Sequence, residues 1–247
     1  MTYIFQLDET GREFIEALDS AVKRGVEVRV LIDGVGADLG FFTVRRALRK
    51  LGIPTAVFLP ARLLSGARGV NLRNHRKLLT IDGETAFTGG MNITENSRLL
   101  RNAKHPVADV HFRIKGPLVA DLQAVFADDW YFATREVLDQ FVWFPPVKEQ
   151  GDVAGRAYID GPDRERTRLP WLLLSAISQA RHRIHIVTPY FLADRSILAA
   201  LGAAALRGID VQIYVPLKTD APVVDWASRR ILKSVTQDEI TGAEKYG

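Results

Sequence analysis

The chain has no cysteine among its 247 residues, so neither a disulfide nor a thiolate metal site can form. Long apolar runs are also missing. The most apolar stretches, 169–177 and 197–206, are about half of the roughly 20 residues that cross a bilayer. The first nine residues lack the basic start and the long apolar centre of a signal peptide. We therefore expect a globular chain that spans no membrane and contacts one only at its surface.

Acidic residues are missing from one segment of the chain. The formal net charge of +4 is too small to indicate nucleic-acid binding, but it suits an anionic partner. Segment 61–81 contains no acidic residue, and its basic residues are Arg62, Arg68, Arg73, Arg76 and Lys77. Such a run can be a solvated loop or a rim that attracts phosphate. The motif that follows it favours the rim.

Apolar spacing predicts helices that alternate with short strands, the pattern of an α/β fold. We expect helices near 10–24, 43–51, 117–135, 170–181 and 196–206, and strands near 26–32, 53–59, 184–191 and 211–215. Thr10 and Glu13 have the spacing of a capping box at the first helix. Residues 77–89 read as a hairpin that turns at Asp82-Gly83.

A group of residues at this hairpin suits displacement at a phosphodiester. The reaction needs an atom that attacks phosphorus and donors that hold the non-bridging oxygens. His75 can attack, the ammonium of Lys77 can bind the oxygens, and Asn92 adds a neutral donor. His75 and Lys77 share one side if they lie on a strand. Asp82, at the turn, fits a carboxylate that tethers the loop or orients a histidine.

The glycine pair Gly89-Gly90 would let backbone approach the substrate closely. The other histidines, which are His105, His111, His182 and His185, have no comparable pattern around them and are expected to be ordinary core or surface residues. No metal site is expected, because Lys77 would repel a cation and only Asp82 and Glu84 supply nearby carboxylates.

The chain also contains an internal repeat after a segment rich in proline, glycine and aspartate at 144–162. Residues 14–32 align with 197–215, which places Gly25 against Gly208 at an offset of 183. We expect two units, 1–145 and 146–247. The same offset from His75 leads to position 258, beyond residue 247, and no second His-x-Lys occurs. We therefore expect the second unit to lack its motif.

Residues 74–93, with His75-x-Lys77-x4-Asp82 and Gly89-Gly90-x-Asn92, resemble the first HKD motif of the phospholipase D superfamily, specifically of the bacterial cardiolipin synthase type. The resemblance covers about residues 3 to 230. It extends in order through 3–8, 24–34, Asp109, 116–117, Trp130, 161–162, 188–191 and 227–229.

The resemblance implies a mixed β-sheet flanked by helices on both faces, as one complete unit plus an incomplete second copy. In such enzymes two motifs meet, one histidine forms a phosphohistidine and the other serves as acid and then base. His75 would be the nucleophile or its partner. Phosphate would be bound by Lys77 and Asn92, with Arg76, Gly89 and Gly90 beside them.

The reaction implied is transfer of a phosphatidyl group between phospholipids, which converts phosphatidylglycerol to cardiolipin and glycerol without a cofactor. We expect an anionic phospholipid substrate, peripheral contact with the cytoplasmic membrane, and a homodimer or a separate second half that completes the centre. Two alternatives stay open: a homodimeric nuclease or phosphodiesterase of the superfamily, and a non-catalytic remnant.

Overall fold

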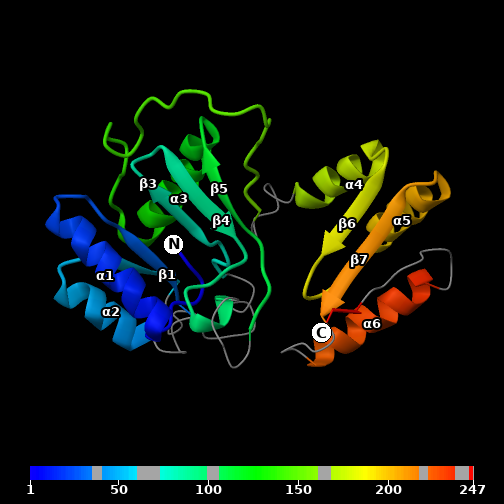
Figure 1. The fold of residues 1–247 in the computed structure, drawn as a ribbon, viewed down its shortest axis with the longest axis horizontal. Helices are drawn as coiled ribbons and strands as arrows, with labels where there is room; N and C mark the ends of the chain where they lie inside the picture. The colour runs from blue at the N-terminus through cyan, green and yellow to red at the C-terminus, as the bar shows by residue number, and fades with distance from the viewer. Residues whose placement is uncertain are drawn as a thin grey trace. The chain divides into compact units, whose positions relative to one another are not determined.

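The computed structural model describes residues 1–34, 41–59, 73–98, 106–160, 168–216, 222–236 and 245–246. The chain divides into two compact units, Met1–Pro162 and Asp163–Gly247 (Figure 1). Among the described helices, none is long and apolar enough to cross a bilayer.

The first unit contains most of the predicted elements close to their expected positions. They are α1 (Glu9–Lys23), β1 (Val30–Asp33), α2 (Phe41–Lys50), β2 (Thr55–Phe58), β3 (Leu78–Ile81), β4 (Thr85–Gly89), a short 3-10 helix η4 (Glu95–Ser97), β5 (His111–Lys115) and α3 (Leu118–Thr134). Strand β5 was not predicted. It pairs antiparallel with β4 and extends the predicted hairpin to three strands.

The N-terminal residues join this hairpin sheet to the parallel pair formed by β1 and β2. Thr2 donates its backbone N–H to Leu31 at 3.1 Å, and the N–H of Leu78 donates to the carbonyl of Met1 at 2.9 Å. Thr2 also forms a parallel bridge with Ile32. Met1 and Thr2 therefore lie between β1 and β3 and link the two sets of strands into one mixed layer.

Helices cover both faces of this sheet (Figure 1). Because successive strand residues point to opposite faces, Val30 and Ile32 pack in one core with α1 and α2, while Leu31 packs in another with α3. Leu31 and Ile32 are each only 1% exposed. The expected fold, a mixed sheet flanked by helices on both faces, is confirmed.

Helix α1 begins two residues earlier than the predicted capping box. Its N-cap is Asp8, whose carboxylate accepts the N–H of Gly11 at 2.9 Å. Asp8 also accepts the N–H of Glu95 at 2.7 Å. The box at Thr10 and Glu13 was wrong because Asp8 already supplies the first-turn acceptor and ties the helix to η4.

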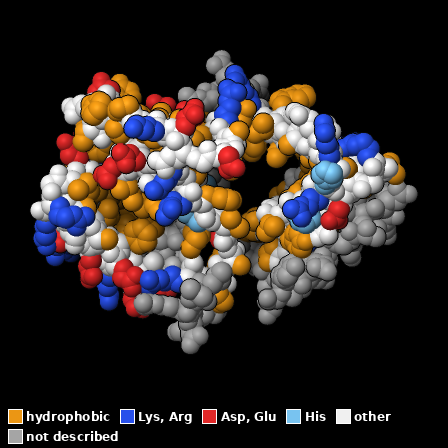
Figure 2. Space-filling model, turned by 45° about the horizontal axis from the view of Figure 1, so that its top comes forward, with side chains coloured by type: hydrophobic (Ala, Val, Ile, Leu, Met, Phe, Trp, Pro, Cys, Tyr) orange, Lys and Arg blue, Asp and Glu red, His pale blue; other side chains and the backbone are white. Residues whose placement is uncertain are grey.

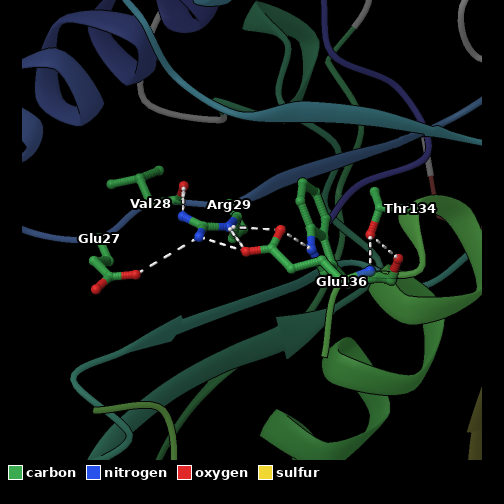
Figure 3. Close-up of polar contacts among 6 residues, drawn as sticks. Glu27, Val28, Arg29, Thr134 and Glu136 are labelled. Carbon is green, nitrogen blue, oxygen red and sulfur yellow. Dashed lines mark hydrogen bonds and ion pairs between the residues drawn. The ribbon is translucent and has the colours of Figure 1, made fainter. Parts of the chain in front are cut away.

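An ion pair fastens the start of β1 to the end of α3 (Figure 3). Arg29 donates to Glu136 through Nη2 at 2.6 Å and through Nε at 3.1 Å. The buried indole N–H of Trp130 donates to the same carboxylate at 2.8 Å. The bond from Arg29, followed by that from Trp130, holds the pKa of Glu136 below its usual value.

The second unit has helices and parallel strands around its own core. Its elements are α4 (Leu169–Gln179), β6 (Arg183–Val187), α5 (Arg195–Leu206), β7 (Asp210–Pro216), α6 (Pro222–Thr236) and β8 (Lys245–Tyr246). Helix α6 and strand β8 were not predicted. Leu201 and Ile213 are among the most buried residues of this core.

The two units share a succession of local structures. Phe5 and Phe191 are buried just before aspartate N-caps, Asp8 and Asp194, which open α1 and α5. Each helix then ends at a glycine with positive φ, +88° at residue 25 and +82° at residue 208, ahead of β1 and β7. A left-handed residue after a helix favours glycine. The repeat seen in the sequence thus has a counterpart in three dimensions.

Glu136→Ala is expected to destabilise the first unit by about 1 to 3 kcal/mol, because the buried indole N–H of Trp130 loses its acceptor. The ion pair with Arg29 is only partly buried and adds little to that figure. The unfolding midpoint in urea measures the effect. Glu149→Ala, at an exposed glutamate with no such contacts, is the control, and equal midpoints for the two variants would contradict the expectation.

Candidate functional site

The loop that carries His75 is fixed by side chains and not by a strand. Strand β3 begins only at Leu78. The backbone N–H of Asn74 donates to the carboxylate of Asp33 at 2.7 Å, and the N–H of Arg76 donates to Oδ1 of Asn74 at 3.1 Å. The expectation that His75 and Lys77 lie on a strand was wrong because these side-chain acceptors replace strand partners.

A second carboxylate, Asp129 of α3, holds the same loop from another side. It accepts Nδ2 of Asn74 at 2.8 Å, and Nη1 of Arg76 lies 2.7 and 3.0 Å from its two oxygens. Nη2 of Arg76 donates to the carbonyl of Asp160 at 3.1 Å. The guanidinium of Arg76 is therefore directed toward α3, while its neighbours His75 and Lys77 meet elsewhere.

His75 and Lys77 meet at Tyr3. The imidazole stacks on the phenol ring with 4.0 Å between centroids and 23° between planes. The Lys77 ammonium lies 5.3 Å from the centroid of the same ring and donates to the carbonyl of His75 at 2.7 Å. The two groups assigned to attack and to phosphate binding thus share one neighbour.

Asn92 is held close to His75 and Lys77 by contacts with the same N-terminal segment that carries Tyr3. Phe5 forms a parallel bridge with Ile93, and the N–H of Ile4 donates to Oδ1 of Asn92 at 3.1 Å. Because Oδ1 accepts this bond, the orientation of the amide is set, and its other polar atom, Nδ2, is a donor. Asn92 is therefore anchored beside the residue that follows Tyr3.

The electrostatics favour a neutral imidazole. Burial lowers the pKa of His75, and the Lys77 charge lowers it further, against an opposing effect of Asp33. Burial also lowers the pKa of Lys77, while Asp109 and Asp33 raise it. A pKa of His75 below the usual 6.5 leaves the ring nitrogen unprotonated and nucleophilic at neutral pH.

Asp82 lies at the opposite end of β3. It is exposed, has a φ of 54°, and forms the hairpin turn in which Glu84 donates its N–H to Ile81 at 3.1 Å. Asp tolerates the left-handed conformation better than most residues do. The structure places Asp82 at the predicted turn and does not bring it to His75.

The glycine pair makes room for the chain itself. A Cβ at Gly89 would lie 2.2 Å from the carbonyl oxygen of Val110, and one at Gly90 would lie 2.2 Å from a carboxylate oxygen of Asp109. Gly89 also pairs with His111, whose Nδ1 is buried without a partner among the described residues. His111 was expected to be an ordinary histidine, yet it adjoins the motif.

Sequence reasoning gave no role in the site to the residues that hold or adjoin the motif: Tyr3, Asp33, Asn74, Asp109, His111 and Asp129. Asp33 carried a usable signal, since a lone carboxylate directly after an apolar strand is commonly at a site edge. Arg62 and Arg68 of the predicted basic segment lie outside the described residues. Within the described part of the chain, no group of three metal-ligating side chains occurs.

Lys77→Gln is expected to raise the pKa of His75, because the positive charge of Lys77 disfavours the imidazolium and its removal relieves that repulsion. The ring chemical shifts of His75 followed by NMR against pH give the titration midpoint. Lys115→Gln removes the same charge from β5 and is expected to leave the midpoint in place. An unchanged midpoint in Lys77→Gln would mean that Lys77 does not act on the imidazole.

Comparisons with known proteins show the family to which the chain is similar. A family described as "Cardiolipin synthase, PLD-like domain" matches residues 1–130 and 173–245. The chain is 35% identical to a cardiolipin synthase of Geobacillus kaustophilus over 92% of its own length and 46% of the relative's. The major cardiolipin synthase of Bacillus subtilis is 37% identical, over 92% and 47%.

A solved structure shares the fold. The phosphatidylserine synthase of Haemophilus influenzae superposes with a TM-score of 0.64 at 15% identity, over 96% of this chain and 63% of that one. The chain spans about half the length of the curated relatives it matches. Its match over most of its residues shows that it belongs to the cardiolipin synthase family of phospholipase D-like proteins.

Proposed function

We propose that this chain supplies the nucleophilic half of a phosphatidyltransferase centre of the cardiolipin synthase type. The observation that carries the proposal is the convergence of His75 and Lys77 on Tyr3, with Asn92 anchored to the adjacent residue. The relatives named cardiolipin synthase support phosphatidylglycerol as the substrate.

The reaction on this half is a displacement at phosphorus. A ring nitrogen of neutral His75 forms a bond to the phosphorus of the donor lipid, and the bond from phosphorus to the oxygen of the headgroup glycerol breaks. Lys77 and Nδ2 of Asn92 hold the non-bridging oxygens as charge builds. The resulting phosphohistidine passes the phosphatidyl group to a hydroxyl of a second phosphatidylglycerol, so that cardiolipin and glycerol are formed.

The other assigned residues have supporting parts in this proposal. Asp82 shapes the hairpin turn, and Arg76 tethers the His75 loop to Asp129, from which its charge still contributes to the field at the phosphate. Gly89 and Gly90 allow β4 to approach Val110 and Asp109 closely. Asp109 in turn supports the charged form of Lys77.

The glycerol leaving group needs a proton, which a second imidazole would supply. No second His-x-Lys occurs in the 247 residues. We propose that this imidazole comes from a second motif outside these 247 residues, which a second copy of the chain, a separate second half or a longer chain would supply. The shared succession around Asp8 and Asp194 supports an interpretation of the second unit as a partial copy of the first.

A substrate that needs no proton at its leaving group tests His75 alone. Bis(4-nitrophenyl) phosphate releases nitrophenolate when a nucleophile attacks phosphorus. We expect the 247-residue chain to give a burst of nitrophenolate. His75→Gln should lower the rate constant of this burst at least about 1,000-fold. Lys77→Gln is expected to lower the same rate constant about 100-fold, because the transition state loses one hydrogen-bond donor.

The exposed His182 supplies the matched control, since His182→Gln should leave the burst unchanged. The same preparations are then given vesicles of phosphatidylglycerol, and cardiolipin is measured by mass spectrometry. A burst without cardiolipin would support a nucleophilic half that lacks its partner. Absence of any His75-dependent product would overturn the proposed chemistry and favour the non-catalytic remnant.

Peripheral contact with an anionic bilayer is part of the proposal, and one face of the hairpin sheet supports it. The register aligns Leu79, Phe87 and Arg113 in one row and Ile81, Thr85 and Lys115 in the next. The alternate residues face α3, so these rows lie on the other face. Leu79 is 38% exposed and Ile81 44%, and both basic side chains are exposed.

This combination fits a lipid headgroup region, where apolar side chains enter and lysine or arginine meets anionic lipid. Hydrophobic side chains lie beside lysine and arginine on the visible surface of the first unit (Figure 2). Lys77 directly precedes β3, the strand that carries Leu79 and Ile81. A lipid bound through its phosphate at Lys77 would then have its bilayer next to this face.

Arg113→Gln with Lys115→Gln is expected to weaken binding to phosphatidylglycerol vesicles about 30-fold at low salt, because each basic residue contributes about 1 kcal/mol. Vesicle flotation measures the effect, with phosphatidylcholine vesicles as the uncharged reference. Arg49→Gln with Lys50→Gln on α2 removes the same charge from another surface. Two results would contradict this face as the membrane contact. One is equal weakening of vesicle binding by both pairs of substitutions. The other is that Arg113→Gln with Lys115→Gln converts a dimer to a monomer in sedimentation but leaves vesicle binding unchanged.

A further inference from the structure

Tyr3 occupies a fixed place between the two parts of the sheet. Its neighbour Thr2 is bonded to Leu31 on one side, and its other neighbour, Ile4, is bonded both to Asn92 and to Ile93. Backbone contacts on both flanks leave the Tyr3 side chain little freedom to move relative to the His75 loop. The phenol ring is therefore a rigid element of the site.

The ring contacts both reactive groups at once. The 4.0 Å stack with His75 holds the imidazole at 23° to the plane of the phenol ring. The Lys77 ammonium, 5.3 Å from the ring centroid, is attracted by the negative face of the ring. Among the described contacts of His75 and Lys77, Tyr3 is the side chain that joins the two.

We propose that Tyr3 is a positioning residue whose aromatic ring fixes the imidazole of His75 for attack and holds the Lys77 ammonium beside it. The inference rests on the proposed chemistry at His75 and names a residue that acts through others, since the ring itself has no role in bond making. A displacement of about 1 Å at reacting atoms can cost 100-fold in rate.

The chemistry of the ring and not of the hydroxyl carries this role. Burial and the nearby Asp33 raise the pKa of Tyr3, so the phenol stays neutral and its ring remains a suitable partner for both an imidazole and an ammonium. Phenylalanine would provide the same face. Leucine would provide a similar apolar bulk without the π system, and alanine would provide neither.

The test compares Tyr3→Phe, Tyr3→Leu and Tyr3→Ala in the 247-residue chain with two readouts. NMR titration gives the pKa of His75, which we expect to stay low in Tyr3→Phe and to rise in Tyr3→Leu and Tyr3→Ala, because Lys77 is no longer held beside the imidazole. In Tyr3→Ala the imidazole also gains water. The nitrophenolate burst should be retained by Tyr3→Phe and fall about 100-fold in the other two.

Tyr158→Leu is the matched control, since Tyr158 also has a cation beside its ring, Arg156 at 5.2 Å, but no histidine. Circular dichroism and the unfolding midpoint identify any variant that fails to fold, and Tyr3→Leu keeps the test valid if Tyr3→Ala does. Equal losses in Tyr3→Phe and Tyr3→Leu, or an unchanged pKa of His75 in Tyr3→Leu, would overturn the proposal. A wild-type chain without a burst would contradict the chemistry at His75, while the titration would still decide the role of the ring.

Discussion

The carboxylate of Asp33 is the constraint on which the site depends. Its residue is only 1% exposed, at the end of β1, and it accepts the backbone N–H of Asn74. A buried carboxylate is costly unless it is hydrogen-bonded, so the loop that satisfies it is held in one position. Asp129 secures the same loop through the side chains of Asn74 and Arg76. His75 lies between these two tethered residues, and its location follows from the burial of charge.

Two opposing requirements meet at this loop. A nucleophilic imidazole must be neutral, whereas a phosphate-binding ammonium must stay charged. Burial lowers the pKa of both His75 and Lys77, which helps the first group and works against the second. Asp109 and Asp33 offset the effect at Lys77, and the Lys77 charge in turn keeps the proton off His75. The arrangement thus favours the neutral form of His75, while Asp109 and Asp33 favour the charged form of Lys77.

Periodicity predicted helices α1 to α5 and strands β1, β2, β6 and β7, because burial on one face leaves a periodic apolar pattern in the sequence. It did not predict β5, where His111, Arg113 and Lys115 alternate with Phe112 and Ile114 on a partly exposed edge strand. The motif itself was evident from its fixed spacing. The role of Tyr3 was not evident, because Tyr3 is 72 positions from His75 in the sequence. The two residues come together only when the N-terminal segment pairs with β1 and β3. Long-range pairing of this kind leaves no periodic signal.

In the proposed reaction, the protonation state of His75 determines what a second group must supply. Attack by His75 needs a neutral base, and the structure provides the means to keep it neutral. Departure of an alkoxide from phosphorus needs a protonated group, which an imidazole of lowered pKa cannot be at the same pH. Lys77 is committed to the non-bridging oxygens in the proposed chemistry. In the proposed chemistry the second group must therefore be an acid whose environment raises its pKa relative to that of His75.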